Sequence, residues 1–111
     1  FGAHTVTHPN LAIVDRRRAE AEIGRSARRI EAELNASVRH FAYPFGRPWN
    51  RTSDTVAIVR RAGFDCAVTT DRGVCRVGGD PYCLPRVVCD GIADGRVLAT
   101  RLSDLWVCVS T

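Results

Sequence analysis

Lysine is absent from this sequence, so all 16 basic residues are arginine, and the formal net charge is +4. An arginine-only set points to a compositional bias, because nucleic-acid-binding proteins usually mix both basic residue types. No apolar run approaches the length that crosses a bilayer, and no signal-peptide pattern is present. We therefore predict no membrane span in this chain and no nucleic acid among its partners.

Paired cysteine spacing is also missing, because none of the five cysteines forms a C-x-x-C pair. A zinc knuckle is therefore not expected. Most of the cysteines are expected to be buried as small hydrophobic residues. A bridge between Cys75 and Cys83 remains an alternative, and the redox compartment stays undecided.

The length and composition are those of one small globular domain. The chain has 111 residues, of which 45% are hydrophobic and 25% charged. It does not begin with Met, and Phe1 to His4 already look like the inside of a strand. We therefore expect the chain to be a piece of something longer.

An amphipathic helix is predicted over residues 16–34, with Asp15 as its N-cap and Asn35 as its stop. Its apolar stripe recurs at spacings of three and four, at Ala19, Ile23, Ala27, Ile30 and Leu34. Arginines and glutamates, Glu22 among them, alternate on the other face. Mixed charge at helical spacing predicts a solvated face.

Strands and helices alternate along the rest of the chain. Short apolar runs predict strands over 38–43, 64–70 and 84–88. Apolar periodicity predicts helices over 53–62 and 94–107, and turn residues cluster at 71–73 and 78–81. This alternation is typical of an α/β fold in which helices cover a parallel sheet or barrel.

Two histidines lie four positions apart in His4-Thr5-Val6-Thr7-His8-Pro9. Imidazole is the commonest transition-metal ligand, so this pair is a candidate half of a metal site. The β-branched residues between them favour extended backbone, and Pro9 keeps His8 out of the helical region. We therefore place His4 at the end of a strand and His8 in the following loop, both turned toward one point. Asp65 and Asp71 are weaker candidates for a third ligand.

Together with three later stretches, this motif resembles the polysaccharide deacetylase family (NodB-homology domain, carbohydrate esterase family 4). Residues 4–9 are similar to the family's His-(Ser/Thr)-x-x-His-Pro motif, and Phe41-Ala42-Tyr43-Pro44-Phe45-Gly46 is similar to its F-x-Y-P-x-G motif. Residues 62–70 and Leu84-Pro85-Arg86-Val87 resemble the strands that follow in the family's order. The four motifs are spread over most of the chain, from His4 to Val87.

The resemblance implies a partial, distorted (β/α) barrel of the glycoside hydrolase–deacetylase type that lacks its first strands. Residues 1–111 would be the C-terminal part of this single domain. It also implies a divalent metal, often zinc, held by His4, His8 and an aspartate expected upstream of residue 1, where the catalytic base is expected too. An acetylated polysaccharide substrate and an extracytoplasmic or cell-envelope location are implied by the family alone. The oligomeric state is not predicted.

Several residues acquire expected roles in the hydrolysis of an acetyl group. The backbone N–H of Phe45 is expected to donate to the oxyanion, as the family's residue at that position does. Thr5 is expected to hydrogen-bond within the loop and fix the orientation of a histidine ring. Tyr43, Pro44 and Trp49 are expected to contact substrate, with Tyr43 and Trp49 stacking on sugar rings.

Two departures from the family pattern keep other functions open. Ala42 stands where many members have an arginine that pairs with the catalytic aspartate, and we expect Arg86 to replace it. No histidine follows His40, so the general acid is unassigned. Both departures favour a non-catalytic relative that binds carbohydrate or metal. An arginine-rich nucleic-acid-binding module is disfavoured by the mixed charge of the first helix.

Overall fold

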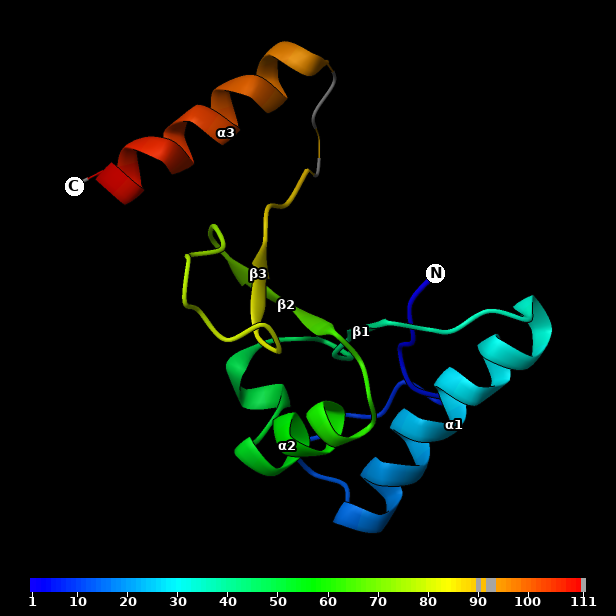
Figure 1. Ribbon diagram of the computed structural model, residues 1–111. Helices are drawn as coiled ribbons and strands as arrows, with labels where there is room; N and C mark the ends of the chain where they lie inside the picture. Colours follow the sequence, from blue (N-terminus) through cyan, green and yellow to red (C-terminus); the bar gives the residue numbers. More distant parts are fainter. Residues whose placement is uncertain (90, 92–93, 111) are drawn as a thin grey trace.

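The computed structural model describes residues 1–89, 91 and 94–110, with side chains described as far as residue 103. The elements in these ranges alternate between helix and strand (Figure 1). They are α1 (Arg16–Leu34), β1 (His40–Ala42), the 3-10 helix η1 (Pro48–Asn50), α2 (Ser53–Arg61), β2 (Cys66–Arg72), β3 (Leu84–Arg86) and α3 (Gly95–Ser110). The α/β class predicted from the sequence is therefore confirmed.

The strands form one parallel sheet in the order β1-β2-β3. Phe41 of β1 lies opposite Ala67 of β2, and Val68 of β2 lies opposite Leu84 of β3. The segment before α1 joins the sheet through a single parallel bridge between Ala3 and Phe41. The strand expected to end at His4 is thus reduced to this bridge. Neighbouring parallel strands in chain order are what successive β-α units produce.

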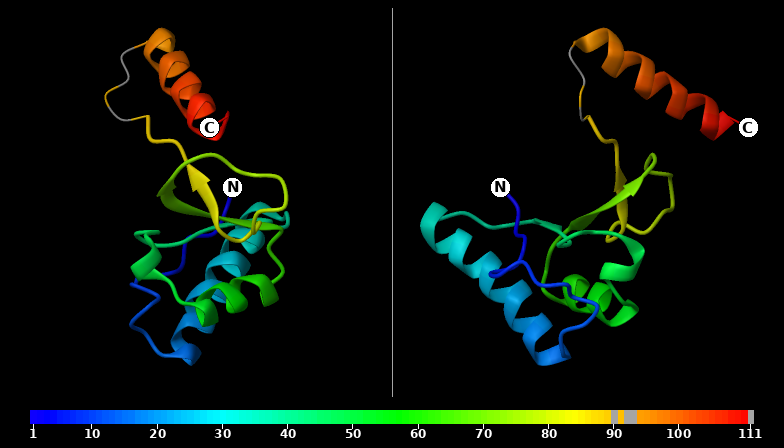
Figure 2. Two further views of the ribbon diagram at one scale, coloured as in Figure 1. Left: turned by 90° about the vertical axis from the view of Figure 1, so that its left-hand side faces the viewer. Right: turned by 180° about the vertical axis from the view of Figure 1, so that it is seen from behind.

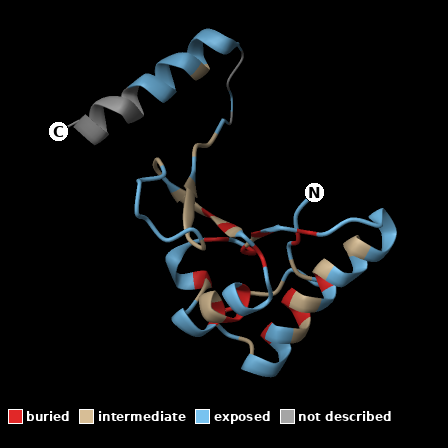
Figure 3. Cartoon of the chain, viewed as in Figure 1, coloured by how far each residue is buried: buried red, intermediate tan, exposed pale blue. Residues whose placement is uncertain are grey.

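Helices α1 and α2 pack on one side of the sheet, and the core lies where they meet it (Figures 1 and 2). Ile23 of α1, Val59 of α2, and Phe41, Phe64 and Ala67 of the sheet region are almost fully buried (Figure 3). Helix α3 extends beyond β3, away from α1 and α2 (Figure 2). None of the helices in the described ranges combines the length and hydropathy needed to cross a membrane.

Local signals set the bounds of the first two helices. The Asp15 carboxylate accepts a hydrogen bond from the Arg18 N–H at 2.8 Å, and Asn35 ends α1 in the left-handed conformation, as the sequence predicts. Thr52 caps α2 by accepting from the Thr55 N–H. Gly63 follows α2 with φ +92°, a conformation that glycine adopts without strain.

Other boundaries and burials differ from the prediction. β2 begins two residues later than expected and runs through Asp71 into Arg72, because Arg72 still pairs with Arg86 of β3. Cys75 and Cys89 are exposed and Cys66 and Cys83 only partly buried, so their expected burial was wrong. Cys75 and Cys83 are free thiols, and the fifth cysteine lies outside the described side chains.

Candidate functional site

His4 lies immediately after the bridge at Ala3, beside the carboxyl end of β1. Its Nδ1 lies 2.8 Å from the carbonyl oxygen of Ala42. Because a carbonyl oxygen only accepts hydrogen bonds, Nδ1 must carry the proton. In the neutral ring, Nε2 then keeps its lone pair. A backbone partner on one ring nitrogen is the usual way in which proteins orient a metal-ligating histidine.

The ring of His8 lies beside the ring of His4. The ring centroids of His4 and His8 are 4.8 Å apart, and those of His8 and Phe45 are 4.7 Å apart, both in edge-to-face orientations. Both histidines are exposed to solvent. The structure therefore brings the two imidazoles and Phe45 together at the carboxyl end of β1.

A tight turn joins the two histidines. The Thr5 hydroxyl accepts a hydrogen bond from the His8 N–H at 3.1 Å and donates to the His4 carbonyl. Thr5 and His8 have φ values of +66° and +56°, which are unfavourable for residues with a side chain. The Thr5 hydroxyl thus links the two ends of the turn. Such backbone strain persists only where surrounding contacts hold it, and it is concentrated at functional sites.

Glu22 of α1 supplies those surrounding contacts, and its predicted place on a solvated face was wrong. Its side chain is only 7% exposed. One carboxylate oxygen accepts from the N–H groups of Val6 and Thr7, each at 2.8 Å, and the other accepts from the Thr7 hydroxyl. Burial raises the pKa of Glu22, but the hydrogen bonds from Thr7 and Val6 outweigh it and hold the pKa below 4.5. The signal in the sequence is its position beside Ile23, at the border of the apolar stripe.

The turn after β1 leaves one backbone donor free. Phe45 and Gly46 have φ values of +62° and +72°. Thr70 of β2 holds the turn, because its N–H donates to the Gly46 carbonyl at 3.0 Å and its hydroxyl donates to the Phe45 carbonyl at 2.6 Å. Within the described part of the chain, the Phe45 N–H donates to no other group. The Phe45 N–H therefore has no acceptor within these residues, while the Phe45 ring contacts His8.

Arg51 is a second support that local patterns did not reveal. Its guanidinium donates to the Gly46 carbonyl at 2.8 Å and to the Asp71 carboxylate at 2.6 Å. The Arg51 side chain is only 12% exposed. Asp71 is therefore committed to Arg51, as Asp65 is to Arg39. Each carboxylate thus has an arginine partner, and neither belongs to a group of three metal-binding side chains among the described residues.

Two of the three expected substrate contacts are wrong. Tyr43 is 1% exposed and donates from its hydroxyl to the Tyr82 carbonyl at 2.8 Å. Burial raises its pKa far above the ordinary range, and its ring packs edge-to-face on Phe41. Pro44 is also fully buried. Both side chains are therefore packed inside the fold, and Tyr43 is part of the hydrophobic core.

Trp49 and Arg86 remain candidates by position. Trp49 lies in η1 and is 72% exposed, so its ring is open to a ligand. Arg86 lies on β3, and its Nε donates to the Thr69 carbonyl of β2. The backbone of β2 thus holds Arg86 at the carboxyl half of the sheet. Its pairing with an upstream aspartate stays a prediction.

The donor set of His4 and His8 fits zinc or a similar divalent metal. Imidazole nitrogens suit this class of ions, and the Ala42 carbonyl leaves the Nε2 of His4 as the donor. No group of three metal-binding side chains occurs among the residues that the structure describes. A third ligand is therefore not supplied by these residues.

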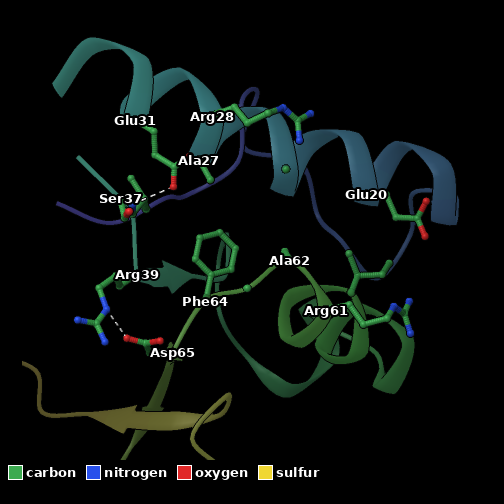
Figure 4. Close-up of a pocket in the computed structure, with 14 residues that line it drawn as sticks. Glu20, Ala27, Arg28, Glu31, Ser37, Arg39, Arg61, Ala62, Phe64 and Asp65 are labelled. Atoms are coloured by element: carbon green, nitrogen blue, oxygen red, sulfur yellow. Dashed lines mark hydrogen bonds and ion pairs between the residues drawn. The ribbon is translucent and has the colours of Figure 1, made fainter. Parts of the chain in front are cut away.

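A pocket of about 720 Å³ lies at the other end of the sheet (Figure 4). It is lined by α1, α2 and the residues that lead into β1 and β2, with Phe64 at its wall and the Arg39–Asp65 ion pair at its edge. These lining residues precede the strands, whereas His4, His8 and Phe45 gather where β1 ends. The pocket is therefore separate from the histidine site.

Solved deacetylase structures share this fold. A deacetylase of Streptococcus pyogenes, PplD in complex with acetate, is 26% identical and matches with a TM-score of 0.80, covering 91% of this chain and 44% of that one. BC0361, a polysaccharide deacetylase from Bacillus cereus, is 22% identical with a TM-score of 0.78, covering 91% and 31%. A mutant of BA3943, a pseudoenzyme of carbohydrate esterase family 4, is 19% identical with a TM-score of 0.55, covering 94% and 41%.

The chain spans less than half of each of these structures. The implied partial NodB-type fold is confirmed by this partial match. No curated protein matches the chain. The model of the polysaccharide deacetylase family matches residues 1–67, which include His4, His8 and the turn at Phe45. The chain therefore belongs to the polysaccharide deacetylase family.

Proposed function

We propose that this chain is the C-terminal part of a metal-dependent hydrolase that removes N- or O-linked acetyl groups from a polysaccharide. The observation that carries the proposal is the convergence of two imidazoles and Phe45, whose backbone N–H has no acceptor among the described residues. His4 and His8 are in ring contact, and His8 is in ring contact with Phe45. Metal-dependent hydrolysis of an acetyl group uses a metal site and an oxyanion donor at one point.

His4 and His8 would hold the metal, with a third ligand and the catalytic base expected from an acidic motif upstream of Phe1. When bound, zinc or a similar ion supplies a water of lowered pKa and polarises the acetyl carbonyl. The Nδ1–H of His4 donates to the Ala42 carbonyl and keeps its proton, which leaves Nε2 as the ligand atom. The Phe45 N–H donates to the developing oxyanion, a contribution typically of about 2.7–4 kcal/mol. The exposed Trp49 ring offers a stacking surface to a sugar.

A non-catalytic relative that binds carbohydrate or metal is the second candidate. Ala42 stands where the family motif has an arginine, and within these 111 residues no histidine follows His40. Arg86 is our candidate for the missing arginine. The similarity of the fold to a pseudoenzyme of the same family makes this alternative concrete.

Zinc binding by the full-length gene product tests the metal site, which the hydrolase and a metal-binding relative would share. We expect one zinc per protein in competition with a chromophoric chelator. His4→Ala and His8→Ala are each expected to lower the affinity by about 100-fold or more, since each removes a ligand. His40→Ala is the matched control, because His40 lies at the amino end of β1. Unchanged zinc affinity in both ligand variants would contradict the proposal.

A further inference from the structure

One buried charge in this fold has no part in the chemistry described above. Glu22 lies on α1 between the core residues Ala19 and Ile23, and its side chain is almost fully buried. A buried carboxylate is unfavourable unless hydrogen bonds replace its hydration. Its partners therefore explain why it is there.

All of those partners lie between the two histidines. Val6 and Thr7 direct their N–H groups to the same carboxylate oxygen, and the Thr7 hydroxyl donates to the second one. The loop runs beside the middle of α1 (Figure 1). Glu22 thus fixes the two residues at the centre of the loop, while His4 and His8 at its ends remain exposed.

The loop needs such a support because its own geometry is unfavourable. Thr5 and His8 both have positive φ values, and within the loop the Thr5 hydroxyl bonds to the His8 N–H and the His4 carbonyl. Without Glu22, two loop N–H groups lose their acceptors and the turn is free to relax. The distance between the imidazoles would then no longer be fixed.

The remaining glutamates of α1 make other contacts. Glu20 and Glu33 form exposed ion pairs with Arg16 and Arg29 on the same helix. Glu31 accepts a hydrogen bond from the Val38 N–H at 3.0 Å, near the carboxyl end of α1. Glu31 is therefore a natural control, because it also joins α1 to a backbone N–H but lies far from the histidines in the sequence.

We propose that Glu22 is a positioning residue that holds the His4–His8 loop in the geometry that binds the metal. The inference rests on the proposed function, since it assigns a metal to the two histidines. It concerns preorganisation: a site held in its binding geometry before the ion arrives loses less order when the ion binds.

Two measurements on the full-length protein test the inference. Amide hydrogen exchange of Val6 and Thr7 in the metal-free protein reports whether Glu22 holds the loop. Competition with a chromophoric chelator reports zinc affinity. We expect Glu22→Ala to speed exchange at both amides and to weaken zinc binding about tenfold or more. Glu22→Gln keeps one oxygen for the two amides, so we expect a smaller increase in exchange and a smaller loss of zinc affinity. Glu31→Ala is expected to change neither quantity.

The outcomes separate this inference from the proposed function. Faster exchange in Glu22→Ala, together with a wild-type protein that binds no zinc, would support the role of Glu22 in holding the loop but remove the metal from the proposed function. Unchanged exchange at Val6 and Thr7 would overturn the inference. Faster exchange with unchanged zinc affinity would also overturn it, because the loop would then be held without consequence for the site.

Discussion

The Nδ1 of His4 and the carbonyl oxygen of Ala42 are 2.8 Å apart, so the last residue of β1 orients the first histidine of the site. No substitution of the Ala42 side chain removes this carbonyl. The family's arginine is absent at this position, yet the backbone still determines which nitrogen of His4 carries the proton. The orientation of His4 is therefore independent of the side chain at the position that departs from the motif.

Arg51→Ala is expected to lower the free energy of unfolding by about 1–3 kcal/mol, because it leaves the Asp71 carboxylate and the Gly46 carbonyl without their partner. Urea unfolding measures this loss. Arg39→Ala is the matched control, since its ion pair with Asp65 is exposed and worth about 1 kcal/mol or less. Equal losses in the two variants would show that Arg51 is an ordinary surface residue.

Gly46→Ala is expected to lower the free energy of unfolding by about 2 kcal/mol or more. Gly46 has φ +72°, and an added Cβ would lie 2.8 Å from the Thr70 backbone nitrogen. Gly63→Ala separates backbone strain from the steric contact. Gly63 also has a positive φ, but nothing lies within 4 Å of an added Cβ. We expect about 1 kcal/mol there. A Gly46 variant as stable as the Gly63 variant would argue against the tight contact with Thr70.

Trp49→Ala is expected to leave stability within about 0.5 kcal/mol, because the ring is exposed. It is expected to raise the KM for an acetylated polysaccharide about fivefold through lost stacking. Tyr43→Phe is expected to change stability and not KM. Loss of the hydrogen bond to the Tyr82 carbonyl costs about 1 kcal/mol of stability and leaves KM unchanged. A rise in KM for the Tyr43 variant would restore the predicted substrate contact.

The stability of the fold is expected to depend on pH through Glu22. Its pKa lies below 4.5 in the folded state, so the ionised form stabilises the fold at neutral pH. This contribution is lost as the pH falls from 4.5 through the lowered pKa. Glu22→Gln is therefore expected to be about 1–2 kcal/mol less stable at pH 7, with the difference shrinking in acid. Thermal unfolding across pH measures it, and a difference that stays constant with pH would contradict the assignment.

Features with local causes were predictable from the sequence. Asp15 and Asn35 set the bounds of α1 through contacts with their immediate neighbours, and the histidine pair carries its own spacing. The roles of Glu22 and Arg51 were missed because Val6, Thr7 and Asp71, which they contact, lie 15 to 20 residues away in sequence. Only the tertiary fold brings these groups together, and the position of Glu22 at the border of the apolar stripe does not identify its partners.

Tyr43 shows a second limit of sequence patterns. It follows a strand of three residues, His40–Ala42, which is too short for alternation to define an inner and an outer face. An aromatic residue beside a motif therefore looks like a substrate contact, although the fold buries it. The same argument applies to Pro44, which is also buried.

The release of acetate by the zinc-loaded full-length protein tests the central claim most directly. The substrates are N-acetylated and O-acetylated polysaccharides, and the comparison is between wild type and His4→Ala. We predict metal-dependent acetate release from at least one substrate by the wild type, and none by the variant. A folded wild-type protein that binds zinc at His4 and His8 but releases no acetate from any of them would contradict the hydrolase and favour the binding-only relative.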